Sequence, residues 1–287
     1  MLRTLTRHLL AMSATVLLSA LAAATLVRLA PGFDVSEQQL DSRLSHESVE
    51  ALRAQRADNA NLWRFYWRYL GRAVRGDFGT SLTLHRPVRE LLQERFLTTA
   101  RLVGLGLLAG WLLAAAFALS AAWFRQPAYD AATAIVGSAV LCVPSAVLAL
   151  VLVLWKAPAC IAIALLVFPK VFRYARDLLA RNYEAPHIVT ARAKGLGPAW
   201  VLFHHVLPVS AAPLIAVAGV SVSMALGAAI PVEALCGIPG IGQLAWQAAL
   251  GRDLALLVTV TVLVAIVTLA ANTLSDLVNS KLPEAQA

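Results

Sequence analysis

The side chains that could do chemistry gather in one polar stretch between two apolar ones. It runs from Arg181 to Gly195 and continues to His204 and His205. Ser138 and Ser145 lie in apolar sequence with no histidine in an adjacent apolar stretch, so the pattern does not indicate a serine nucleophile with its base. We expect the polar stretch to contact a partner protein rather than to catalyse a reaction. The alternative interpretation is an ordinary basic loop between two membrane spans.

The sequence contains no recognisable motif for binding a nucleotide or a metal ion. No Gly-x-x-x-x-Gly-Lys-Ser/Thr phosphate-binding loop occurs, so if ATP drives the protein, a separate subunit must bind it. The three cysteines, Cys142, Cys160 and Cys236, have neither metal-binding nor redox spacing. We therefore expect no metal site and no cofactor bound by this chain.

The composition indicates a membrane protein. Of the 287 residues, 59% are hydrophobic and only 14% are charged, whereas a soluble domain carries about 25% charged residues. The formal net charge of +8 suits anionic lipid headgroups and acidic partner surfaces. Nucleic acid is not an expected partner, because the basic residues lie between the apolar stretches. We predict an all-α, polytopic membrane protein.

Six apolar stretches are long enough to be considered transmembrane helices, at residues 9–30, 96–124, 131–155, 160–174, 206–230 and 254–277. Pro144 is expected to kink the third, and the fourth is short, with Lys170 near its inner end. The basic N-terminus and the basic stretch after the fourth span should share one side of the membrane, which requires an even number of crossings between them. We therefore expect both termini in the cytoplasm.

Few ionisable residues lie within the predicted spans, and those few are expected near span ends: Arg28, Arg101, Lys170 and Asp276. An ion-coupled carrier normally needs such groups at membrane depth, so this pattern argues against one. An ion-coupled secondary carrier nevertheless remains an alternative at this point.

Local signals divide the polar stretch into two short helices with a break between them. Residues 189–194 are good helix formers, while Gly195 and the Gly197-Pro198 pair end a helix. Residues 199–206 can then form a second helix before Pro208. A helix, a break and a second helix form a compact element that a soluble partner protein could bind and move.

A second polar segment, residues 33–95, contains apolar and aromatic residues at helical spacing: Trp63, Tyr66, Trp67, Leu70 and Val74. The spacing predicts an amphipathic helix that lies at the membrane interface or packs on the spans. In either case a structural role is favoured over contact with a substrate.

Three motifs, in the same order along the chain, resemble those of ABC importer permeases of the oligopeptide/dipeptide/nickel family. The first, Arg75-Gly76-Asp77-Phe78-Gly79, resembles the external segment of that family. The second resembles its cytoplasmic coupling loop and consists of Thr190, Ala191, Arg192, Ala193, Lys194 and Gly195, followed after nine intervening residues by His205, Leu207 and Pro208. The third resembles its external re-entrant loop and consists of Glu233, Pro239, Gly240 and Gly242, with Cys236 where an aromatic residue is usual.

The resemblance implies a type I ABC importer permease fold in a bacterial inner membrane. Residues 1–95 would form the first span and the external amphipathic segment, and residues 96–287 a core of five spans with a coupling loop at 177–205. The implied partners are a second permease subunit, two ATP-binding subunits and an external solute-binding protein. Peptides are the implied substrate, with nickel or another small solute as the alternative. A degenerate subunit with a scaffold role is a further alternative, because the fourth span is short.

Overall fold

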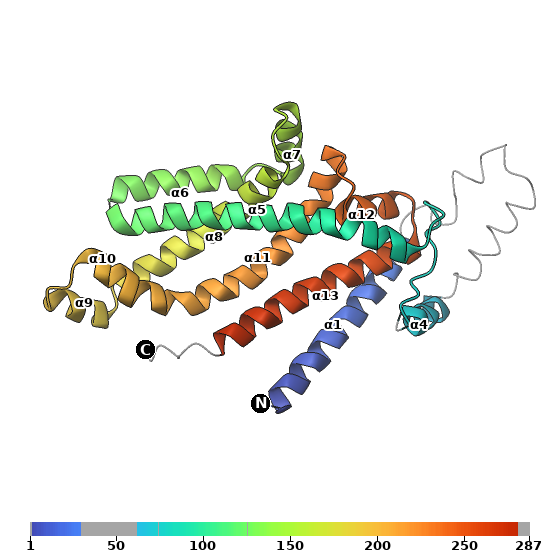
Figure 1. The fold of residues 1–287 in the computed structure, drawn as a ribbon, viewed down its shortest axis with the longest axis horizontal. Helices are drawn as coiled ribbons and strands as arrows, with labels where there is room; N and C mark the ends of the chain where they lie inside the picture. Colours follow the sequence, from blue (N-terminus) through green and yellow to red (C-terminus); the bar gives the residue numbers. More distant parts are fainter. Residues whose placement is uncertain (1, 30–61, 74, 125, 281–287) are drawn as a thin grey trace, which may run out of the picture. The chain divides into compact units, whose positions relative to one another are not determined.

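The computed structural model describes residues 2–29, 62–73, 75–124 and 126–280. This part of the chain is helical, with one isolated antiparallel bridge between Thr80 and Pro87, so the all-α prediction is confirmed for it. The helices, drawn in Figure 1, are α1 Leu2–Leu29, α4 Leu62–Ala73, α5 Val88–Phe124, α6 Pro127–Leu141, α7 Ser145–Leu154, α8 Cys160–Tyr183, α9 Pro186–Ala193, α10 Pro198–Val201, a π-helix Leu202–Val206, α11 Leu207–Cys236, α12 Ile241–Leu250 and α13 Leu254–Asn279.

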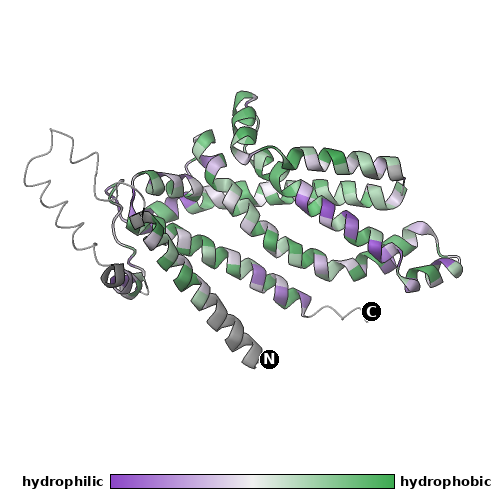
Figure 2. Ribbon diagram, turned by 180° about the vertical axis from the view of Figure 1, so that it is seen from behind, coloured by the Kyte–Doolittle hydropathy of each residue, from purple (hydrophilic) through white to green (hydrophobic). Residues whose placement is uncertain are grey.

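Three helices of the described chain are long and apolar enough to cross a membrane: Val88–Phe124, Pro198–Cys236 and Leu254–Asn279. A fourth candidate is the pair Ala131–Leu141 and Ser145–Leu154, if the two count as one broken span. Figure 2 shows hydrophobic residues along most of these helices, whereas hydrophilic residues collect along the half of α8 that leads to α9. The class of fold is thus as expected, while the number of six spans stays a prediction.

The expectation of one kinked helix across residues 131–155 is wrong. α6 ends at Leu141, α7 begins at Ser145, and the two are bent by 91°. Pro144 has φ −59° and ψ 143°, which is not helical, and precedes the first residue of α7. Because proline lacks an N–H and disfavours a helical residue before it, the chain breaks here instead of kinking.

The helix that contains the fourth predicted span is longer than that span. α8 continues past Tyr174 to Tyr183, with Pro169 inside it, so residues 177–183 of the predicted loop are helical. Lys170 is therefore 13 residues from the end of α8, or about 20 Å at 1.5 Å per residue. That Lys170 lies near the inner end of the fourth span stays a prediction, because α8 continues through charged residues that need not lie within the membrane.

The chain forms two compact units. The first comprises Met1–Leu97 and Gln243–Ile266. In it, Tyr66 of α4 donates a hydrogen bond to the Leu17 carbonyl of α1 at 2.7 Å, and Tyr69 donates to Thr259 Oγ1 of α13 at 3.1 Å. Burial raises the pKa of the Tyr69 hydroxyl above its ordinary value, which keeps the proton in place for this bond. Trp67 remains exposed.

The amphipathic helix predicted between residues 63 and 74 is thus present as α4. Its two tyrosines pack on α1 and α13, with Ala20, Ala24, Leu254 and Val258 in the same cluster. The side chains of Trp63 and Val74, which belonged to the predicted stripe, lie outside the described residues. The contacts that are described support the expected structural role of this helix.

The second unit comprises Thr98–Gly242 and Val267–Ala287. Its core brings α5 and α8 into close contact at two glycines four residues apart. A Cβ on Gly106 would lie 2.6 Å from Ile163 Cβ, and a Cβ on Gly110 would lie 3.0 Å from the Ala164 carbonyl oxygen. Small residues at this spacing let helix backbones approach closely, as membrane helices commonly do. At the far end of α8, Asn182 Nδ2 donates a hydrogen bond to Ser210 Oγ of α11 at 2.7 Å.

Candidate functional site

The polar loop, which we define as residues 184–208, begins with α9. Pro186 occupies the first turn of this helix, where a missing N–H costs nothing. Ile188 and Ala191 are buried and join the core of the second unit, while Thr190 is exposed. The predicted short helix is confirmed, although it begins three residues earlier than residue 189. Its remaining motif residues, Arg192, Ala193 and Lys194, are all exposed.

The predicted break follows at Gly195. Its φ is +79°, a conformation that side-chain-bearing residues rarely adopt, and its N–H donates to the Arg192 carbonyl at 2.9 Å. Leu196 N–H donates to the Ala191 carbonyl at 3.4 Å, which completes the end of the helix. Gly197 then precedes the next helix, which starts with Pro198. Four residues thus separate the end of α9 from the start of α10.

The second short helix of the polar loop changes type within its length. α10 covers Pro198–Val201, and a π-helix follows at Leu202–Val206 and runs directly into α11. The motif residues His205 and Leu207 are partly buried, and Pro208 is exposed in the first turn of α11. The predicted second helix is confirmed, but the π turn could not be read from the sequence.

The outer face of the polar loop is apolar and basic. Val189, Trp200 and Phe203 are 59%, 53% and 55% exposed, and Trp200 stacks on His204 with ring centroids 3.8 Å apart. The Arg192 guanidinium lies 5.3 Å from the centre of the Tyr183 ring. Exposed aromatic residues beside cationic side chains are typical of a surface that binds another protein. The buried residues of both short helices hold this face on the core.

Glu233, near the end of α11, is fully buried. Its Oε1 accepts a hydrogen bond from Thr99 Oγ1 of α5, and its Oε2 accepts one from the Gly242 N–H, each at 2.7 Å. Thr99 Oγ1 in turn accepts a hydrogen bond from the Ile241 N–H at 2.7 Å. These bonds fix the residues that connect α11 to α12 against the start of the long α5 helix. We call this segment, residues 233–242, the Glu233 loop.

The structure brings three of the four predicted residues of the Glu233 loop together. A Cβ on Gly240 would overlap the Glu233 carboxylate, and a Cβ on Gly242 would lie 2.8 Å from the Ala229 carbonyl oxygen. Glycine is therefore required at both positions, because a Cβ would collide with these neighbouring atoms. Pro239 is exposed and makes no part of this contact. Thr99 was not predicted as a site residue, and its one signal in the sequence is a polar side chain at the start of an apolar run.

The segment Arg75–Gly79 forms a tight turn ahead of α5. Asp77 Oδ1 accepts a hydrogen bond from the Gly79 N–H at 2.9 Å, and the Gly79 carbonyl accepts one from the Val88 N–H at 3.0 Å. Gly76 and Gly79 both have positive φ. Phe78 is partly buried, and Arg75 is exposed. Through these contacts the segment fixes the backbone path that leads into α5.

Asp253, which is not among the predicted site residues, holds this region in place. It is fully buried, and its Oδ2 accepts hydrogen bonds from Ser81 Oγ at 2.6 Å and from the Thr83 N–H at 3.2 Å. Its Oδ1 accepts a hydrogen bond from the Leu256 N–H at 3.1 Å, which caps the start of α13.

The polar loop and the Glu233 loop belong to the second unit, and the Arg75–Gly79 segment belongs to the first. Among the described residues, no group of three or more His, Cys, Asp or Glu could hold a metal ion.

Long apolar helices joined by a helix–break–helix loop define a membrane-embedded protein. The chain belongs to the family of binding-protein-dependent transport system inner membrane components, whose family model matches residues 106–283. It is a permease subunit of an ABC importer.

Relatives and a solved structure agree with this assignment. The chain is 26% identical over 278 residues to the "Probable peptide ABC transporter permease protein y4tP" of Sinorhizobium fredii, covering 88% of each chain. It is 26% identical over 263 residues to the glutathione transport system permease protein GsiC of Salmonella paratyphi A, covering 85% of each. Its fold matches a chain of the MetNI methionine ABC transporter in inward-facing conformations with a TM-score of 0.60 and 17% identity. That match covers 67% of this chain and 96% of the other.

Proposed function

We propose that this permease subunit imports peptides, and that the polar loop is its coupling loop to a separate ATPase. The observation that carries the proposal is the outer face of the polar loop. Val189, Trp200 and Phe203 are more than half exposed, although Ile188 and Val201 beside them are buried in the core. A face that is anchored from behind and apolar in front transmits force from a partner to α8 and α11. The peptide substrate is supported by the relatives, which are named as peptide and glutathione permeases.

The same proposal includes the other members of the transport system. Two ATP-binding subunits bind and hydrolyse ATP and press on the polar loops of two permease subunits, while an external solute-binding protein delivers the substrate. Both termini and the polar loop lie in the cytoplasm, and six spans cross the inner membrane. In this arrangement the Glu233 loop and the Arg75–Gly79 segment face outward. Residues 1–95 supply the first span and the external segment, and residues 96–287 supply the permease core.

The proposal is tested by purifying the tagged chain in mild detergent, identifying its partners by mass spectrometry, and reconstituting the recovered complex in vesicles. We expect an ATPase and a second permease to copurify, and uptake of radiolabelled trialanine to require ATP. Phe203→Asp should remove the ATPase, because a carboxylate replaces the apolar contact and opposes an acidic partner. Gln93→Asp, which places the same charge on an exposed residue of α5, is the control.

Other outcomes assign the chain differently. Uptake that follows an ion gradient in vesicles without ATP would overturn the proposal in favour of a secondary carrier. ATP-dependent uptake of Ni²⁺ but not of trialanine would retain the permease and coupling roles and reject the peptide substrate. A stable complex that transports neither would indicate a scaffold subunit.

A further inference from the structure

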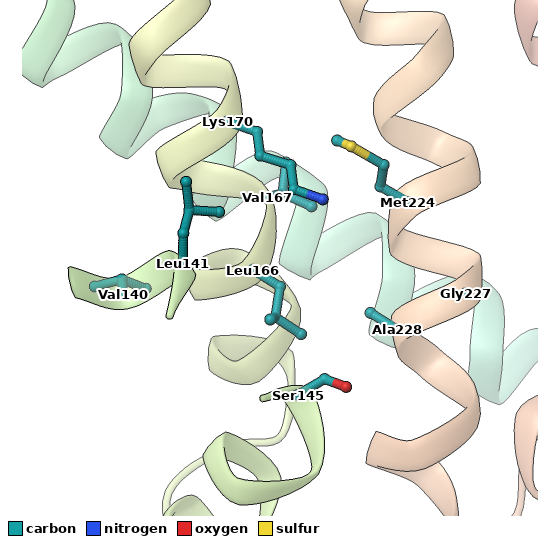
Figure 3. Close-up of a pocket in the computed structure, with 9 residues that line it drawn as sticks. All are labelled: Val140, Leu141, Ser145, Leu166, Val167, Lys170, Met224, Gly227 and Ala228. Atoms are coloured by element: carbon teal, nitrogen blue, oxygen red, sulfur yellow. The ribbon is translucent and has the colours of Figure 1, made fainter. Parts of the chain in front are cut away.

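A cavity of about 240 Å³ lies among α6, α7, α8 and α11 of the second unit. It opens where the chain breaks between α6 and α7, so that Leu141 and Ser145 line one side of it. Leu166 and Lys170 of α8 and Met224 of α11 line the others. Figure 3 shows these side chains around the space between α8 and α11.

Lys170 is the charged residue of this cavity. Figure 3 shows its ammonium group extending from α8 toward α11, on the side of Met224. Among the described residues no hydrogen bond or ion pair involves Lys170. The other residues that line the cavity are apolar, apart from Ser145, whose hydroxyl is a second possible donor. The cavity therefore offers hydrogen-bond donors and a positive charge, but no carboxylate of its own.

The cavity lies several helical turns from the polar loop along α8 and α11. The contact between Asn182 and Ser210 marks the end of α8 and α11 that adjoins the polar loop. Lys170 is 12 residues from Asn182, and Met224 is 14 residues from Ser210, which correspond to about 18 and 21 Å of helix. Arg173 lies between Lys170 and this contact, and the Lys170 side chain is exposed. Its charge is therefore open to an anionic group that enters the cavity.

We propose that this cavity binds a carboxylate group of the transported solute, with Lys170 as its counter-ion and Ser145 as a neutral donor. The inference rests on the proposed function, in which the solute is a peptide with a free C-terminal carboxylate. Ligand pockets commonly measure about 300–1,000 Å³, so this smaller cavity holds one end of a peptide and not the whole. Leu166 and Met224 provide apolar contact for the adjoining side chain.

The first test measures uptake by the reconstituted complex. Trialanine and its C-terminal amide differ only in the carboxylate that Lys170 is proposed to bind. Lys170→Met should lower uptake of trialanine several-fold and leave uptake of the amide within twofold, so that the preference for the acid is lost. Lys156→Met removes the same charge from the exposed turn between α7 and α8 and should change neither. An unchanged preference in Lys170→Met would overturn the proposal.

The second test needs no transported solute. The substitution S145C is made in a chain whose three native cysteines are replaced by alanine, and the complex is placed in phosphatidylcholine vesicles. The anionic sulfonatoethyl and the cationic trimethylammonioethyl methanethiosulfonates are then compared as reagents for the new thiol. Lys170 should favour the anionic reagent, and Lys170→Met should reduce the ratio of the two rates on the order of tenfold.

The two tests separate the possible failures. If the wild-type complex takes up neither peptide, the peptide substrate is wrong, and the thiol reaction still decides whether an anion site exists. An equal rate ratio with Lys170 and Lys170→Met, or no reaction of the S145C thiol at all, would overturn the site. Loss of the anionic preference only when phosphatidylglycerol is added would assign the charge to a lipid headgroup and reject the solute.

Discussion

Replacement of Gly240 by alanine should strongly destabilise the second unit. The new Cβ would overlap Glu233 Oε2 and lie 2.5 Å from Oε1, so the carboxylate must leave its position. Moving it breaks the hydrogen bonds from Thr99 Oγ1 and from the Gly242 N–H. Glu233 is fully buried, so water does not replace these partners.

The magnitude follows from the bonds that are lost. A hydrogen bond to a charged group contributes about 1.5–3 kcal/mol, so losing two costs about 3–6 kcal/mol. For a chain of this size the midpoint of thermal unfolding, Tm, should fall on the order of 10 °C. The measurement is thermal unfolding of the detergent-purified complex, followed by fluorescence-detected gel filtration. Gly104→Ala is the matched control, because nothing lies within 4 Å of a Cβ at that helical position.

A double-mutant cycle tests the cause of the effect. In the background of Glu233→Ala the carboxylate is absent, so Gly240→Ala should lower Tm by no more than a few degrees. Residues that act through one contact are non-additive in this way. If Gly240→Ala lowers Tm equally with and without Glu233, the reasoning from overlap is refuted.

Three further predictions concern other contacts. Asp253→Ala should cost about 2–4 kcal/mol by thermal unfolding, because Ser81 Oγ and two backbone N–H groups lose their buried acceptor; an unchanged Tm would contradict the role of this residue. Gly106→Ala should cost about 1–3 kcal/mol from overlap with α8, whereas Gly104→Ala on the same helix should be tolerated. Gly195→Pro should uncouple ATP hydrolysis from uptake while membrane insertion is retained, because proline cannot adopt φ +79° and loses the N–H bonded to Arg192. Normal uptake per ATP in that variant would reject the coupling role.

Local constraints explain what the sequence could predict. Gly195 and the Gly197-Pro198 pair marked the break of the polar loop, because positive φ and a missing N–H act on neighbouring residues only. Pro144 showed where the third span changes direction, but the 91° bend depends on the packing of α7, which single-sequence patterns do not carry. The predicted fourth span ends at Tyr174 because the sequence becomes charged from Arg173 onward, whereas α8 continues to Tyr183 because a helix needs only continued backbone hydrogen bonds.

Contacts between distant residues explain what the sequence could not predict. Thr99 and Glu233 are 134 residues apart in the chain, and nothing near either residue indicates the other. Ser81 and Asp253 are 172 residues apart, and nothing near either residue indicates the other. The contact of Gly106 with Ile163 likewise depends on which helices are neighbours. Such pairs are set by the tertiary fold.

The π-helix between α10 and α11 sets the angular phase of α10 relative to α11. An α-helix turns about 100° per residue, so the one extra residue in a π turn rotates the preceding face by about that angle relative to α11. Trp200 consequently points outward while Val201 is buried. Deleting one residue between Leu202 and Val206 would restore a regular helix and turn the tryptophan away from its present direction, with the composition of the loop almost unchanged. The direction in which Trp200 points therefore depends on the number of residues in the π-helix as well as on their identity.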